Sequence, residues 1–136
     1  MTSYKIKYIK NNRYVKAYRL FILDMFNCIV KKINEENIKL KTAISLRRLL
    51  ESNKNYPHNE NDIDAIVKSY GKISDEGDIR KATVSNILNA KSVAKSTTLI
   101  LILEAMGFSL TDFAKTYYSI SEPDIVAFKK FLLSRE

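Results

Sequence analysis

Apolar residues recur at helical spacing in the second half of the chain. In the segment 79–91 (IRKATVSNILNAK), Val84, Ile87 and Leu88 follow the i, i+3, i+4 pattern of one buried helical face. The other positions carry basic, hydroxyl and amide side chains and no carboxylate: Arg80, Lys81, Thr83, Ser85, Asn86 and Asn89. A helix that is merely solvated usually mixes both charge signs on its outer face. The pattern therefore favours a helix that meets a polyanion, with an ordinary surface helix as the alternative.

Two more helices are predicted directly after this one. Ser96 or Thr97 can cap a helix whose interior, LILILEAM, is apolar enough to predict burial on most sides, and Gly107 stands where a left-handed C-cap ends a helix. Ser109 and Asp112 have the spacing of a capping box, which opens the next helix. The apolar face of that helix consists of Leu110, Phe113, Ala114 and Tyr117. The predicted order is a polar outer helix, an apolar core helix and an amphipathic closing helix.

The N-terminal region admits two interpretations. Residues 4–9 (YKIKYI) alternate apolar residues with lysine in the period of a strand, and Asn11 and Asn12 could form the turn to a second strand, RYVKAY. The alternative, which the pattern favours, is a basic arm followed by a long helix from about residue 15 to about residue 36. The predicted buried face of that helix consists of Tyr18, Ile22, Met25, Ile29, Val30 and Ile33.

Two further helices complete the predicted fold. Ser45 can cap a short helix, SLRRLLESN, with its leucines inward and Arg47 and Arg48 outward. The stretch NKNYPHNEND follows, and its proline and asparagines make it the most loop-like part of the chain. Ser121, with Pro123 in the first turn, starts a last helix. The fold class is therefore all-α, with a small N-terminal β-strand or hairpin as the alternative at residues 4–18.

The order of these segments resembles the lambda-repressor-like (Xre) helix-turn-helix family. ATVSNILNAK followed by TLILILEAMGFSLTDF looks like the recognition helix, the buried fourth helix and the fifth helix, and the resemblance covers residues 79–118. The chain departs from the family at Ala90, where members usually have glycine, and at Leu88, where they have an acidic or amide residue. The second helix of the motif is either residues 63–70, with an extended turn, or a helix placed so that residues 74–78 form part of the turn.

The resemblance implies a sequence-specific DNA-binding transcriptional regulator, a dimeric repressor that reads the major groove of double-stranded DNA. The implied base-reading residues are Lys81, Ala82, Ser85 and Asn86. The implied phosphate-binding residues are Arg80, Thr83, Lys91, Lys95 and Thr97. The family's mode of action implies a homodimer on a palindromic site, with the long N-terminal helix and the last helix as candidate dimer surfaces. We expect an N-terminal extension (1–42) and a helix-turn-helix bundle with a C-terminal helix (43–136), together forming one compact unit.

Charge and composition leave two other functions open. The formal net charge is +8, and residues 1–50 contain 12 Lys and Arg against 3 Asp and Glu. Tyrosines alternate with the basic residues of the first nineteen positions, a mixture that fits nucleic acid as well as an ordinary solvated face. One alternative is therefore an RNA-binding protein. The other is an antitoxin-like module that binds DNA and also covers a second, toxin-like protein with its N-terminal region.

Catalytic and metal-binding chemistry find little support in the sequence. His58, the single histidine, lies in the loop-like stretch without a cysteine partner. Glu60, Asp62 and Asp64 alternate as in a calcium loop, but they lack the central glycine and the terminal glutamate that such a loop needs. We therefore expect a protein that is not an enzyme and that uses no cofactor and no metal.

The single cysteine and the longest apolar run bear on location. Cys28 lies in the run LFILDMFNCIV, which predicts a buried, inert thiol in a reducing compartment. Asp24 and Asn27 interrupt this run, and it is too short to span a bilayer. The expected location is cytoplasmic, with no membrane partner.

Overall fold

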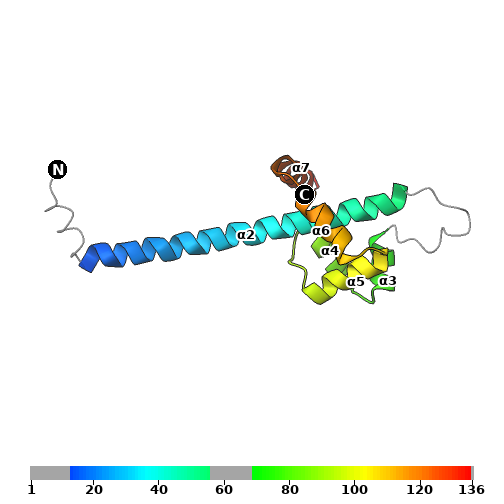
Figure 1. Ribbon diagram of the computed structural model, residues 1–136, viewed down its shortest axis with the longest axis horizontal. Coiled ribbons are helices and arrows are strands. Elements are labelled where there is room, and N and C mark those ends of the chain that lie inside the picture. The colour runs from blue at the N-terminus through cyan, green and yellow to red at the C-terminus, as the bar shows by residue number, and fades with distance from the viewer. Residues whose placement is uncertain (1–12, 56–68, 136) are drawn as a thin grey trace, which may run out of the picture. The chain divides into compact units, whose positions relative to one another are not determined.

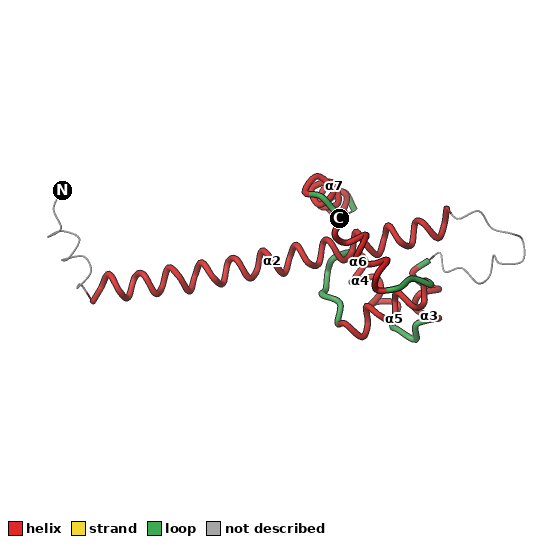
Figure 2. Tube along the Cα trace, in the orientation of Figure 1, coloured by secondary structure: helices red, strands yellow, loops and turns green. Residues whose placement is uncertain are grey.

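The computed structural model describes residues 13–55 and 69–135, and these residues form helices and short connections without a strand (Figures 1 and 2). The helices are α2 (Arg13–Asn55), α3 (Tyr70–Glu76), α4 (Lys81–Leu88), α5 (Ser96–Met106), α6 (Leu110–Ser119) and α7 (Glu122–Leu133). The all-α class is confirmed for this part of the chain. The predicted strand RYVKAY is wrong, because α2 begins at Arg13. The other proposed strand, residues 4–9, and its turn lie outside the described residues.

Helix α2 is much longer than predicted, at 43 residues. It joins the two helices expected before and after residue 40, because the segment between them, NIKLKTAI, contains no glycine or proline that would end a helix. The predicted cap at Ser45 is wrong for the same reason. Ser45 lies inside the helix, where its hydroxyl donates a hydrogen bond of 2.7 Å to the carbonyl oxygen of Lys41, four residues earlier.

The chain divides into two compact units, Met1–Glu36 and Asn37–Glu136. In the first unit, the side chains of residues 15–31 are exposed. The predicted buried face is therefore wrong for Tyr18, Ile22, Met25, Ile29 and Val30, whereas the Ile33 side chain lies outside the description. The predicted burial of Cys28 is also wrong, because this residue is exposed. The described part of the first unit is a single helix, so its apolar side chains have no second helix within the unit to pack against.

The second unit has two clusters of buried apolar side chains. One joins α2, α3, α4 and α5, and consists of Leu46, Leu49, Leu50, Ile73, Val84, Ile87, Leu88, Ile102, Leu103 and Met106. The other joins α2, the turn after α4, and α7, and consists of Leu40, Ala43, Ile44, Ala90, Ile120, Ile125 and Phe128. Residues 40–50 of α2 contribute to both clusters. This segment is therefore the central element of the second unit.

Helix α5 is only partly buried, although its sequence predicts burial on most sides. Ile102, Leu103 and Met106 are buried, whereas Leu101 is 43% exposed. The core lies on one side of α5, so an apolar residue on the opposite side has nothing to cover it. The predicted capping by Ser96 or Thr97 is also wrong, because Lys95 is the N-cap and makes no side-chain capping hydrogen bond.

Capping boxes open both of the following helices. The Ser109 hydroxyl accepts a hydrogen bond from the Asp112 backbone N–H (3.2 Å), and the Asp112 carboxylate accepts one from the Ser109 N–H (2.9 Å), as predicted. Ser121 and Asp124 form the same arrangement at the start of α7, which confirms the predicted last helix. On α6, however, Leu110 of the predicted apolar face is 53% exposed.

These two carboxylates predict a loss of stability in acid. Hydrogen bonds from the Ser109 hydroxyl and N–H lower the pKa of Asp112 below its ordinary value of 3.8. Hydrogen bonds from the Ser121 N–H and hydroxyl, and the ion pair with Arg48 at 2.8 Å, lower the pKa of Asp124 in the same way. A depressed pKa gives stability that is present above the unfolded value and is lost as the pH falls through the folded value.

We therefore expect the free energy of unfolding to fall below about pH 4 as these carboxylates become protonated. In the double variant Asp112→Asn and Asp124→Asn, this part of the decline should disappear. Urea unfolding at a series of pH values measures both profiles. Identical slopes for the wild-type protein and the double variant would contradict the assignment.

Gly107 ends α5 in the left-handed conformation, with φ +79°. A Cβ atom at this position would have no other atom within 4 Å, so a substitution tests the backbone alone. Gly107→Ala is expected to lower the free energy of unfolding by about 1–2 kcal/mol. Gly71→Ala, in α3, is the control, and it should be neutral or stabilising because this backbone has no positive φ and the nearest atom would be 3.8 Å away. Equal losses in urea unfolding would disprove the strain at Gly107.

Candidate nucleic-acid interface

Helix α3 immediately precedes α4, and residues 77–80 connect them. Ser69 is the N-cap of α3, with extended backbone and a hydroxyl that accepts a hydrogen bond from the Lys72 N–H at 3.2 Å. The predicted second helix at residues 63–70 is therefore wrong at its end, because Ser69 is extended and a new helix begins at Tyr70. Residues 63–68 lie outside the described residues. The alternative prediction placed residues 74–78 in the turn. Residues 77 and 78 do belong to the connection between α3 and α4, whereas Ser74 lies inside α3.

The connection between α3 and α4 is tightly held. The Gly77 N–H donates to the Ile73 carbonyl oxygen at 3.0 Å, and the Ile79 N–H donates to the Ser74 carbonyl oxygen at 3.0 Å. A Cβ at Gly77 would lie 3.0 Å from both the Ile73 oxygen and the Ile79 side chain, so a larger residue would require these neighbours to shift by a few tenths of an ångström. Asp78 has φ +50°, a left-handed conformation that Asp tolerates better than most residues. The turn thus fixes the angle between the two helices.

The buried face of α4 is as predicted. Val84, Ile87 and Leu88 are at most 2% exposed and pack in the core with residues of α2, α3 and α5. The opposite side of α4 carries the four predicted base-reading residues. Lys81, Ala82 and Asn86 are exposed there, and Ser85 is half-buried. One continuous helical face therefore displays all four.

The predicted phosphate-binding residues lie around this face. Arg80 is the N-cap of α4, Lys95 is the N-cap of α5 and Thr97 is in the first turn of α5. These three residues and Lys91 are exposed, whereas Thr83 is half-buried. No Asp or Glu occurs between residues 79 and 103, so the surface formed by α4, the following turn and the start of α5 is purely basic in its charged residues.

Arg47 holds the C-terminal end of α4. Its Nε donates to the Leu88 carbonyl oxygen and its Nη2 donates to the Asn89 side-chain oxygen, both at 2.6 Å. The prediction that Arg47 points outward is wrong, whereas Arg48 is exposed as expected. The positive charge of Arg47 also interacts favourably with the negative end of the α4 dipole.

Aromatic rings surround the Arg47 guanidinium. The centroids of Tyr70, Phe128 and Phe131 lie 5.9, 5.4 and 5.3 Å from it. Burial lowers the pKa of Arg47, although a guanidinium remains protonated at neutral pH. Arg47 thus connects α2, α3 and α7 to the end of the predicted recognition helix. The signal for this role was its place on the stripe that Leu40, Ala43 and Leu50 form at helical spacing.

Asn89 and Ala90 shape the turn that follows α4. The Asn89 side-chain N–H₂ donates to the Ser85 carbonyl oxygen at 2.8 Å and to the Ser85 hydroxyl at 3.2 Å. Ala90 has φ +55°, so an alanine occupies the left-handed position at which the resembled family has glycine. Ala90 is 9% exposed and belongs to the cluster with Leu40 and Phe128. Burial of this side chain offsets part of the cost of the left-handed backbone.

Other kinds of site find no support in the described part of the chain. Its His, Cys, Asp and Glu side chains form no group of three or more that could hold a metal ion. His58, Glu60, Asp62 and Asp64 lie outside it. None of its helices is by itself long and apolar enough to cross a membrane, and α5 and α6 meet that criterion only as a pair, bent by 102°.

Comparison of the chain with protein-family models, curated proteins and solved structures gave no match.

Proposed function

We propose that the protein is a sequence-specific DNA-binding transcriptional regulator of the lambda-repressor-like helix-turn-helix type. One observation carries this proposal: α4 follows α3 after a four-residue turn, and its outward face carries basic, hydroxyl and amide groups without a carboxylate. The major groove of B-DNA admits an α-helix. In this arrangement α4 enters the groove as the recognition helix, and α3 crosses the DNA backbone.

Each of the four residues on the outward face of α4 would have a matching partner on DNA. Asn86 offers a donor and an acceptor to adenine, and Lys81 donates to guanine. The Ala82 methyl group suits the methyl group of thymine. The Ser85 hydroxyl accepts a hydrogen bond from Asn89, which leaves its proton available for a base. These four residues form the proposed base-reading set.

The proposed phosphate contacts flank this set. Arg80 and Thr83 would contact phosphates near the start of α4, and Lys91 would do so after its end. Lys95 and Thr97 lie at the N-terminus of α5, where unpaired backbone N–H groups and the positive end of the helix dipole favour an anion. The proposal implies a non-enzymatic, cytoplasmic protein.

Selection of bound duplexes from a random DNA pool tests this function. We expect one enriched sequence with two-fold symmetry, because the proposed regulator is a homodimer and its operator mirrors the protein symmetry. No enrichment would contradict sequence-specific binding. Preferential capture of single-stranded RNA in competition would favour the RNA-binding alternative.

Exposed apolar side chains on α2 favour a second protein contact. Between residues 15 and 30 they include Leu20, Phe21, Leu23 and Phe26, each at least 50% exposed. A large exposed apolar patch usually marks an interaction surface. In the proposed homodimer this surface, or that of α7, contacts a second copy. In the antitoxin-like alternative it contacts a toxin-like protein instead.

Sedimentation equilibrium of the purified chain distinguishes these two partners. A dimer at micromolar concentration supports the homodimer. A monomer that still binds DNA supports the antitoxin-like alternative, in which the apolar surface serves a different protein.

A further inference from the structure

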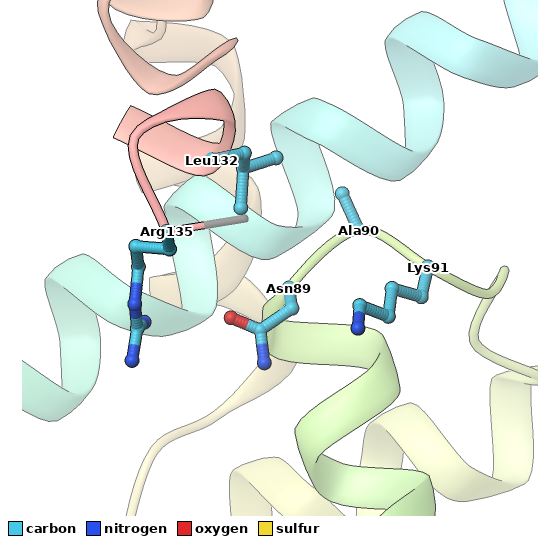
Figure 3. A pocket seen from close by; sticks show the side chains of 5 residues that line it. All are labelled: Asn89, Ala90, Lys91, Leu132 and Arg135. Atoms are coloured by element: carbon cyan, nitrogen blue, oxygen red, sulfur yellow. The ribbon is translucent and has the colours of Figure 1, made fainter. Parts of the chain in front are cut away.

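The turn after α4 and the end of α7 form a pocket of about 400 Å³ (Figure 3). Asn89, Ala90, Lys91, Leu132 and Arg135 line it. In Figure 3 the side chains of Arg135, Asn89 and Lys91 extend toward the same side, with Asn89 between the two basic residues. The pocket thus presents two cations, and no carboxylate occurs among its lining residues.

We propose that this pocket binds a phosphate of the DNA backbone, so that α7 extends the proposed DNA-binding surface beyond α3, α4 and α5. The inference rests on the proposed function and adds a contact that the sequence did not predict, Arg135. Lys91 is the only residue of the pocket already expected to bind phosphate.

Among the described residues that line the pocket, two like charges occur without a carboxylate. Within the described residues, neither Lys91 nor Arg135 forms an ion pair. Arg135 also lies near enough to Arg47 for its charge to contribute to the lowered pKa of that guanidinium. Three cations in one neighbourhood repel one another, and a bound anion relieves this repulsion.

The groups around the pocket are held in position. The Arg135 guanidinium lies 5.3 Å from the centroid of the Phe131 ring, which restricts its movement. Asn89, whose amide group is occupied by hydrogen bonds with Arg47 and Ser85, forms a fixed wall between the two basic residues. A guanidinium that is already restricted loses less conformational entropy when an anion binds.

The end of α4 would ordinarily repel an anion, because free carbonyl groups collect there. In this protein those carbonyl groups have partners. The Leu88 oxygen accepts from Arg47 at 2.6 Å, the Asn86 oxygen from the Lys91 N–H at 2.8 Å, and the Ile87 oxygen from the Ala90 N–H at 3.1 Å. The cations therefore dominate the field in the pocket.

The pocket also lies in line with the base-reading face. Ala82, Asn86 and Asn89 follow one another at i, i+4 and i+7, which places them on one side of the helix. Asn89 lines the pocket at the end of this row. A DNA strand that follows α4 along the groove edge would therefore bring a phosphate to Lys91 and Arg135.

The salt dependence of duplex binding tests this inference. In Arg135→Gln, we expect weaker binding to the selected and to a scrambled duplex alike, and a slope of log K against log salt that is shallower by about 0.9. Lys91→Gln should give a similar change. Lys129→Gln removes the same charge from an exposed position of α7 outside the pocket, and it should leave the slope unchanged.

The outcomes separate this inference from the proposed function. If the wild-type protein binds no duplex, both fail. If Asn86→Ala loses discrimination while Arg135→Gln and Lys129→Gln keep the wild-type slope, the pocket inference fails and the proposed function stands. If inorganic phosphate shifts the amide resonances of residues 89–91 but Arg135→Gln leaves the duplex slope unchanged, the pocket takes a small anion and the DNA contact is overturned. Thermal unfolding of each variant confirms that it is folded.

Discussion

Leu103→Ala is expected to lower the free energy of unfolding by about 2–5 kcal/mol. Leu103 is 1% exposed and belongs to the cluster that joins α2, α3, α4 and α5. The substitution removes buried carbon atoms and leaves a cavity that the neighbouring helices fill only in part. Because Val84 and Leu88 of α4 belong to the same cluster, the cavity also weakens the support of the proposed recognition helix.

Leu101→Ala is the matched control for this substitution. It makes the same chemical change two residues away in the same helix, so the effect of alanine on helix propensity is nearly equal in both variants. Leu101 is 43% exposed, and its truncation should cost much less, on the order of 0.5–1 kcal/mol. Urea unfolding compares the two. A loss below about half a kcal/mol for Leu103→Ala would contradict its place in the core.

Local signals in the sequence were sufficient to predict several helix ends and one helix face. Ser109 with Asp112, Ser121 and Gly107 act through hydrogen bonds and backbone angles within a few residues of themselves. The buried side of α4 was equally predictable, because the spacing of Val84, Ile87 and Leu88 determines which way they face once the helix forms. These features depend little on distant parts of the chain.

Features that depend on distant packing were predicted less well. Arg47 looks like a surface residue in sequence, and only the approach of α4 and α7 gives its guanidinium a carbonyl group to bind and aromatic rings to stack on. The spacing of apolar residues predicted burial of both Cys28 and Leu101, and both are exposed. Spacing alone does not reveal whether another helix packs against that side. Continuity of α2 through Ser45 was missed because serine favours the N-cap, whereas inside this helix its hydroxyl bonds to the carbonyl oxygen four residues earlier.

The candidate site also contains residues that the sequence could predict and one that it could not. The outward residues of α4 could be named from the sequence, since they are the complement of its buried side. Arg135 could not be named, because it lies 44 positions after Lys91 and only the fold brings the end of α7 beside the turn after α4.

Asn86→Ala and Lys81→Ala are each expected to weaken binding to the selected duplex by about 1–3 kcal/mol, or about 5- to 150-fold. Both side chains are exposed on the outward face of α4, and neither contributes to the core. The substitutions should therefore leave folding intact and remove hydrogen bonds to base edges. Binding to a scrambled duplex should change little for Asn86→Ala, because an uncharged side chain adds nothing to the electrostatic part of nonspecific binding.

Lys95→Ala provides the contrast, because Lys95 is exposed at the N-cap of α5 and would meet a phosphate instead of a base. Its removal should weaken binding to the selected and the scrambled duplex by the same factor and make the salt dependence shallower. The ratio of the two affinities is thus the decisive quantity, since it falls for Asn86→Ala and Lys81→Ala but stays constant for Lys95→Ala. If the ratio stays at the wild-type value in both α4 variants, α4 does not read the bases, and the antitoxin-like protein-binding function becomes the better explanation of this surface.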